Sequence, residues 1–300
     1  VTITNVTFTD NAADFGGAVF NDGGNGGASN PQIVNAVFAA NSANTSGGAI
    51  LNNGGSSGTS SPTITNTTFT GNTASSSGGA VFNLGVLSGT SNPQITNATF
   101  TGNSADFGGA IFNDGRDGTS SPTMVNATFT SNTASTEGGA IYSDGSSGTS
   151  SPTIANTILH GNSASDGAEI FNRAATPTLS HTLIEGGLGG ISENNGSSTT
   201  DGGGNLDAAP SFVDAGDPDG PDDTFATDDD GLRVVSSSPA IDAGDNTALP
   251  ADVSDLDGDS DTSEPIPVDR TGADRIQTGT VDLGAYEGGI AATLTVDGTA

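Results

Sequence analysis

Four aspartates in the last third of the chain have the spacing that most clearly suggests chemistry. They alternate with other residues along one acidic segment: Asp255, Asp257, Asp259 and Asp261. Closely spaced carboxylates are the oxygen ligands that Ca²⁺ prefers. The segment is not an EF-hand loop, because Ser260 and Ile266 stand where that loop needs glycine and glutamate. A calcium site formed by these four aspartates and a solvated acidic turn are therefore the two alternatives.

The second kind of chemistry to consider is that of an enzyme acting on polysaccharides. A lyase needs a base beside an anionic sugar, but the chain has 35 acidic and only 5 basic residues, all of them arginine. A glycosidase needs two carboxylates about 5–10 Å apart on one face, and acids are sparse before residue 200. The sequence therefore favours a non-catalytic protein. The alternative is a carbohydrate-active enzyme (polysaccharide lyase or glycosidase) or a glycan-binding module.

Charge and composition exclude several other partners. The formal net charge is −30, and such a field repels nucleic acid and anionic membranes. The chain has no cysteine, which excludes disulfides and thiolate metal sites. No apolar run reaches the roughly 20 residues that a membrane helix needs. We expect neither a nucleic-acid partner nor a membrane span.

A repeat in the first half of the chain must position whatever chemistry exists. One copy reads SPTITNTTFTGNTASSSGGAVFN from Ser61. Its Gly-Gly-Ala step recurs with a period of 30 or 31 residues, beginning at Gly16, Gly47, Gly78, Gly108 and Gly138. Self-similarity of this length is typical of stacked repeats.

The repeat predicts a parallel β-helix with about 30 residues per coil and six regular coils. Equivalent residues should then lie above one another. We expect one interior stack from Phe8 to Leu159, a second from Phe20 to Phe171, and hydrogen-bonded asparagine amides along the ladder. Residues 1–185 form the regular part of the chain. Residues 186–300 are expected to continue the β-helix as an acidic, loop-rich segment that ends in a strand at 290–296.

Two family resemblances rest on these motifs. Over residues 1–172, Phe-x-x-Asn paired with Gly-Gly-Ala-(Ile/Leu/Val) resembles the repeat of chlamydial polymorphic outer-membrane proteins and related surface β-helices of bacteria and archaea. The resemblance implies a right-handed parallel β-helix, exposed at the cell surface and in some members adhesive. Three later segments resemble the C-terminal region of choice-of-anchor Q β-helix proteins: Leu206–Val213, Ser238–Asp245 and Val281–Glu287.

The first coil suggests self-assembly. Val1–Asn5 aligns with Pro62–Asn66, so an open coil face should present Ile3, Phe8 and Phe20. The last strand, with Ile290, Leu294 and Val296, is a natural partner for that face in another copy. Because such a head-to-tail contact does not close on itself, it would produce a filament.

The sequence also suggests where the protein is located and where it could be glycosylated. The chain opens with Val1, so a signal peptide would be already removed or absent, and we expect an extracellular protein at the cell surface. Asn44 and Asn195 lie in Asn-x-Ser/Thr triplets on predicted loops, which makes them candidate glycosylation sites. The expected function is that of a structural or adhesive surface or matrix component, with itself and surface glycans as partners and Ca²⁺ as the only candidate cofactor.

Overall fold

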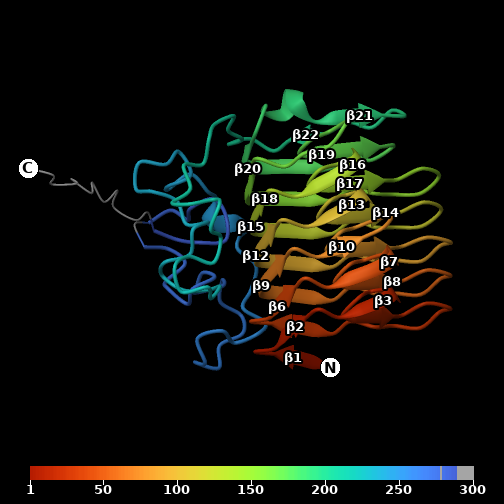
Figure 1. Ribbon diagram of the computed structural model, residues 1–300, viewed down its shortest axis with the longest axis horizontal. Helices are drawn as coiled ribbons and strands as arrows, with labels where there is room; N and C mark the ends of the chain where they lie inside the picture. Colours follow the sequence, from red (N-terminus) through yellow and green to blue (C-terminus); the bar gives the residue numbers. More distant parts are fainter. Residues whose placement is uncertain (278, 289–300) are drawn as a thin grey trace, which may run out of the picture.

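The computed structural model describes residues 1–277 and 279–288. Within them the chain is all β, apart from two short 3-10 helices, η1 (Leu188–Gly190) and η2 (Asn246–Ala248). No helix in this part of the chain is long and apolar enough to cross a membrane. Parallel strands stack into a β-solenoid of about six turns (Figure 1), which confirms the predicted parallel β-helix.

In the described residues the first five coils contribute strands to three parallel sheets, and the later coils contribute to two of them. Sheet A has ten strands: β1 (Thr2–Thr4), β2 (Thr7–Thr9), β5 (Gln32–Val34), β6 (Val37–Ala39), β9 (Thr63–Thr70), β12 (Gln94–Thr101), β15 (Thr123–Thr130), β18 (Thr153–Leu159), β20 (Thr178–Ile184) and β22 (Thr200–Asp201). Sheet B has five: β3 (Ala12–Phe15), β7 (Ser42–Ser46), β10 (Thr73–Ala74), β13 (Ser104–Phe107) and β16 (Thr133–Glu137). Sheet C has seven: β4 (Val19–Asp22), β8 (Ile50–Asn53), β11 (Val81–Leu84), β14 (Ile111–Asp114), β17 (Ile141–Asp144), β19 (Ile170–Arg173) and β21 (Ser192–Asn194).

The predicted interior stack of phenylalanines is present. Rings at the same position of successive coils lie parallel, with centroids 4.6–5.0 Å apart: Phe8, Phe38, Phe69, Phe100 and Phe129. Leu159 takes the same place in the next coil and pairs with Phe129 in the strand register. Because strands in neighbouring coils are one interstrand spacing apart, the rings meet at stacking distance.

A second ladder inside the solenoid is made of amides. The side-chain Nδ2 of each asparagine donates to the Oδ1 of the one in the next coil at 2.8–2.9 Å, through Asn11, Asn41, Asn72, Asn103, Asn132 and Asn162. Asn103 also donates to the carbonyl oxygen of Phe69 at 3.0 Å. Buried polar groups are costly without partners, so this chain of hydrogen bonds fixes the register of the coils. It ends on the buried Glu169 carboxylate, whose pKa burial raises to about 7.

The corners explain two other repeated residue types. The asparagines at the corner within the long strands of sheet A, such as Asn66 in β9 and Asn97 in β12, have φ of 49°, a left-handed conformation that asparagine tolerates. In the Gly-Gly-Ala step, Gly78 has φ 63°, and a Cβ on Gly79 would lie 2.1 Å from the carbonyl oxygen of Gly109 in the next coil. Only glycine permits coils to stack this closely.

The second predicted interior stack is wrong. In sheet C, Val81 and Asn83 point into the solenoid, whereas Phe82 points outward. Successive side chains of a strand alternate between its two faces, so only one of the adjacent apolar residues can enter the core. The outward series forms a separate apolar cluster on the outer face of sheet C: Leu51, Phe82, Phe112, Tyr142 and Phe171. Phe20, in the first coil, is 51% exposed.

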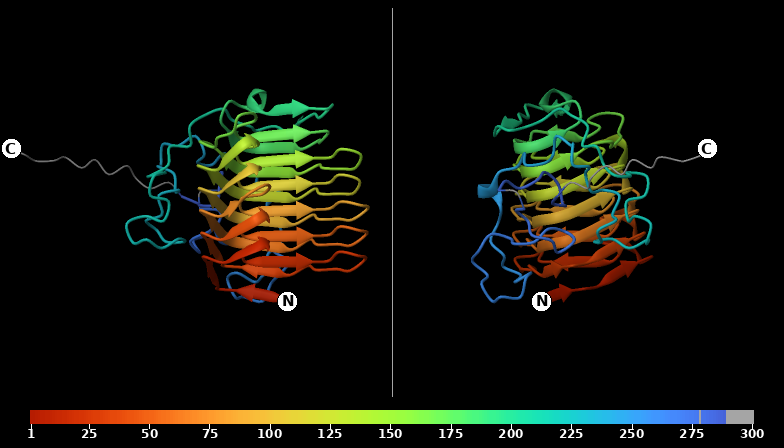
Figure 2. Two further views of the ribbon diagram at one scale, coloured as in Figure 1. Left: turned by 45° about the vertical axis from the view of Figure 1, so that its right-hand side comes forward. Right: turned by 90° about the vertical axis from the view of Figure 1, so that its left-hand side faces the viewer.

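The C-terminal segment does not continue the stack as expected. Residues 186–206 add one partial coil, in which β21 pairs with β19 and β22 pairs with β20. Residues 207–277 and 279–288, which we call the flank, instead lie along the outer face of sheet A (Figures 1 and 2). The predicted strand at 290–296 lies outside the described residues.

Polar contacts fasten the flank to several coils. Arg270 donates to the Oγ1 of Thr68 at 3.0 Å, and the amide N–H of Ala285 donates to the Oγ1 of Thr128 at 3.1 Å. Asn156 accepts from the Asp245 amide N–H at 2.8 Å. Thr68 and Thr128 are therefore buried, although they lie on the outer face of the solenoid. The flank covers this face because threonines there offer it hydrogen-bond partners.

The three segments that resemble choice-of-anchor Q proteins meet at one place. Phe212, Ala240 and Leu283 each come from a different segment and pack on Ile158 and Leu183 of sheet A. These motifs are therefore the core of the flank.

A buried network of charges lies beside this core. The fully buried Arg275 donates to the carbonyl oxygens of Asp282 and Gly284 at 2.9 and 2.7 Å. Its Nε lies 3.9 Å from a Glu287 carboxylate oxygen. Burying the charged Arg275 guanidinium without these partners would cost too much free energy. The network therefore keeps the flank in a single arrangement.

The amide ladder makes a testable prediction about stability. Asn103→Ala removes the oxygen that accepts from the backbone and side-chain amides of Asn72, and the side-chain donor to the Oδ1 of Asn132, all inside the solenoid, so we expect a loss of about 3 kcal/mol in the free energy of unfolding. The matched control is Asn44→Ala, which removes an exposed amide bonded to Asp14 of the previous coil and should cost less than about 0.5 kcal/mol. Urea unfolding of both variants measures the difference. Equal losses would contradict a special role for the buried ladder.

Candidate functional site

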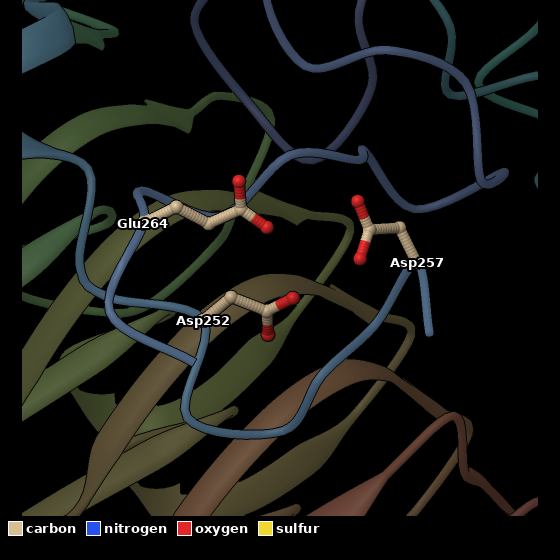
Figure 3. A group of neighbouring side chains, drawn as sticks. All are labelled: Asp252, Asp257 and Glu264. Carbon is tan, nitrogen blue, oxygen red and sulfur yellow. The ribbon is translucent and has the colours of Figure 1, made fainter. Parts of the chain in front are cut away.

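Carboxylates of the flank converge at the predicted acidic segment. Asp252, Asp257 and Glu264 point toward one another (Figure 3), and each offers an oxygen within 4.8 Å of the others. Asp255, Asp257 and Asp259 form a second group of the same kind. Asp257 belongs to both groups, so five carboxylates surround one short stretch of loop.

The structure brings together three of the four aspartates predicted from the sequence. Asp261 belongs to neither group, because its Oδ1 accepts from the amide and hydroxyl of Ser263 at 3.0 and 2.7 Å. Asp252 and Glu264 were missed. An antiparallel bridge between Ala251 and Pro265 brings them together across the ends of the segment, and their separation along the chain gives no signal for this contact.

Electrostatics in this group favour a cation. Burial raises the pKa of Asp252, and Asp257 and Asp255 raise it further. Burial and the neighbouring aspartates likewise raise the pKa of Glu264. No ion pair among the described residues reaches these carboxylates. A hard divalent cation would relieve this repulsion, and oxygen ligands of this type suit Ca²⁺.

The residues predicted to drive self-assembly have different positions. Ile3 and Phe8 are partly buried against the end of the main core. In the described chain β1, β3 and β4 are the edge strands at the N-terminal end of their sheets. Phe20 lies on β4 in the register of Leu51, so its side chain is on the outer face of sheet C and not in the core at the end of the stack. Ile290, Leu294 and Val296 lie outside the described residues.

Both predicted glycosylation sites are exposed. Asn44 lies on β7, where its side-chain amide donates to Asp14 at 2.9 Å. Asn195 follows β21 with φ 55° in the last partial coil. Both side chains can be reached by solvent, and glycosylation at either remains a prediction.

A pocket on the outer face of sheet C was not predicted. Its volume is about 260 Å³, and its walls include Phe107, Arg116, Tyr142, Asp144 and Arg173. Arg116 is held by Asp114, with Nη2 2.6 Å from a carboxylate oxygen, and lies 3.9 Å from Asp144. Arg173 lies 3.4 Å from Glu137 and 5.9 Å from the centre of the Tyr142 ring.

The sequence carried a weak signal for this pocket. Arg116 and Arg173 are the only basic residues before residue 200 apart from the two histidines. Arg173 also stands in the strand register of Asp144, one coil further on. The spacing of these two arginines could be interpreted only once it was known that Arg173 faces the outside of sheet C.

The repeats match a known protein family. Three segments match the model of the Chlamydia polymorphic membrane protein (Chlamydia_PMP) repeat: residues 66–84, 97–114 and 126–144. Each segment begins at a corner asparagine of sheet A and ends in sheet C, so each spans most of one coil. No curated protein matches the chain. The match confirms the resemblance of the repeats, whereas the resemblance of the flank to choice-of-anchor Q proteins rests on its motifs alone.

Proposed function

We propose that this protein is an extracellular, non-catalytic solenoid that acts as an adhesive or structural component at a cell surface. The observation that carries the proposal is the match of three consecutive coils to a polymorphic membrane protein repeat, combined with a β-solenoid fold. This combination fits a surface protein of adhesin type. A rigid solenoid presents a long outer surface, which is the feature such a role needs.

A carbohydrate-active enzyme is the weaker alternative. The two acids of sheet C nearest the pocket, Asp114 and Asp144, accept hydrogen bonds from amides of their own turns. Asp114 is also paired with Arg116. Both acids are thus engaged in holding the turns and the arginine, and this arrangement supports binding better than acid catalysis.

Adhesion to cells tests the main proposal. Beads coated with the purified protein should adhere to cell surfaces and to immobilised extracellular matrix, because the outer face of the coils supplies the contacts. Beads coated with the isolated protein after urea unfolding serve as the control. Adhesion no greater than that of the unfolded control would refute the proposal.

We further propose that copies associate head to tail. The support is that β1, β3 and β4 each have a strand partner on one side only within the described chain, and unpaired strand edges accept further strands. Negative-stain microscopy should show filaments of the purified protein, and deletion of residues 290–300 should abolish them. The matched control is Thr293→Ala, which keeps the segment 290–296 that the sequence predicts to be a strand. Discrete short rods for the unaltered protein at every Ca²⁺ concentration would contradict the proposal.

We also propose that the flank binds Ca²⁺ through the five carboxylates around Asp257. Binding to the folded state alone stabilises it by about 2.7 kcal/mol at 100 times the dissociation constant, so Ca²⁺ should raise Tm. Asp257→Asn removes the carboxylate common to both groups and should abolish the rise. Asp222→Asn, in the other acidic run of the flank, should leave it intact. An equal rise in Tm for the Asp257 variant would overturn the assignment.

A further inference from the structure

Two arginines from different coils meet at the pocket on sheet C. Arg116 follows β14, and Arg173 is the last residue of β19, yet both line the same hollow. In a chain with 5 basic and 35 acidic residues, this placement concentrates scarce guanidinium groups at one point. Guanidinium groups and carboxylates arranged side by side form multiple directed hydrogen bonds.

Aromatic rings form the wall of the pocket beside the two arginines. The Tyr142 ring stacks on Phe112 at 4.5 Å and on Phe171 at 5.0 Å between centroids. Phe107 approaches Tyr142 edge-on at 5.8 Å and is only partly buried. The stack is rigid because strand pairing fixes each ring in its coil. The pocket therefore offers a preformed apolar wall with polar groups at its rim, as small-molecule sites do.

The pocket has one hydrogen-bond donor left over. The Nε of Arg173 is buried and has no partner, although the Nη2 of the same group lies 3.4 Å from Glu137. A buried donor without an acceptor costs about 1–3 kcal/mol. Because this Nε has almost no surface open to solvent, a ligand oxygen would reach it only after a small shift of the Arg173 side chain, which is itself 35% exposed.

The charges of the pocket indicate a neutral ligand. Arg116 and Arg173 face three carboxylates, Asp114, Asp144 and Glu137, so the acids outnumber the arginines locally. The net charge of −30 also repels anions. Hydroxyl groups can accept from Arg173 and donate to Asp144, which suits this mixed rim.

We propose that this pocket binds one neutral sugar unit of a surface glycan, with the ring against Phe107 and its hydroxyl groups between Asp144 and Arg173. The volume of about 260 Å³ lies just below the range of about 300–1,000 Å³ for larger ligands, which fits one ring of a longer chain. The inference rests on the proposed adhesive function and gives it a substrate class.

Calorimetric titration of the whole protein tests the inference. The probes are neutral tetrasaccharides of glucose, mannose and galactose, with hyaluronan and heparin tetrasaccharides as anionic counterparts. We expect at least one neutral probe to bind with Kd of about 1 mM or tighter, equivalent to about −4 kcal/mol. Arg173→Gln should weaken binding at least about tenfold, since it removes the unpartnered donor and its charge.

The matched control is Arg233→Gln on the flank, where Arg233 pairs with Asp228 at 2.8 Å. Its affinity should equal that of the unaltered protein, and Tm values should show that both variants fold. Binding of anionic probes alone, no neutral binding up to about 10 mM, or equal weakening in both variants would overturn the inference. Loss of sugar binding in Arg173→Gln together with loss of cell adhesion would support both the pocket and its part in adhesion. Cell adhesion that survives while sugar binding is lost would still support the pocket as a sugar site and would overturn only its link to the proposed adhesive function.

Discussion

The whole molecule depends on hydrogen bonds that one coil can make only with its neighbours. Each interior asparagine, such as Asn103, is satisfied by the coil before it and the coil after it. Backbone groups of the three sheets follow the same rule. Because these groups are buried, a shift of register by one residue would leave a whole series without partners. This constraint makes the solenoid rigid and explains why the repeated residues vary so little.

The outer faces of sheets A and C differ in their role. Threonines and Ile158 on the outside of sheet A are covered by the flank, so that face is structural. The outside of sheet C instead carries the aromatic series and the pocket with Arg173. A rigid ladder beneath this face holds groups from several coils in fixed positions, and such preorganisation favours weak but specific binding.

Much of the fold could be predicted from the sequence because the repeat reports spacing directly. The Phe8 stack and the asparagine ladder follow from equivalent residues lying above one another. The direction of Phe82 could not be predicted, because Val81 beside it is equally apolar and only the corner geometry decides which one enters the core. The flank has no period, so its position along sheet A carried no signal in the spacing of its residues.

The sites were harder to predict than the fold for a related reason. The alternating aspartates around Asp257 were visible as a local pattern, but Asp252 and Glu264 join them only through a chain reversal. The pocket is assembled from residues about one or two coils apart, and Arg116 and Arg173 stand at different places in the repeat. Local spacing reveals groups within one segment and misses those built across coils.

The central claim is that the repeat forms an inert scaffold and that recognition occurs on the outer face of sheet C. A crystal structure of the protein grown with a saturating neutral tetrasaccharide tests it most directly. We expect a sugar ring against Phe107, with a hydroxyl oxygen within hydrogen-bonding distance of the Arg173 guanidinium. A sugar bound on the flank or at the end of the stack, with the sheet C pocket empty, would contradict the account.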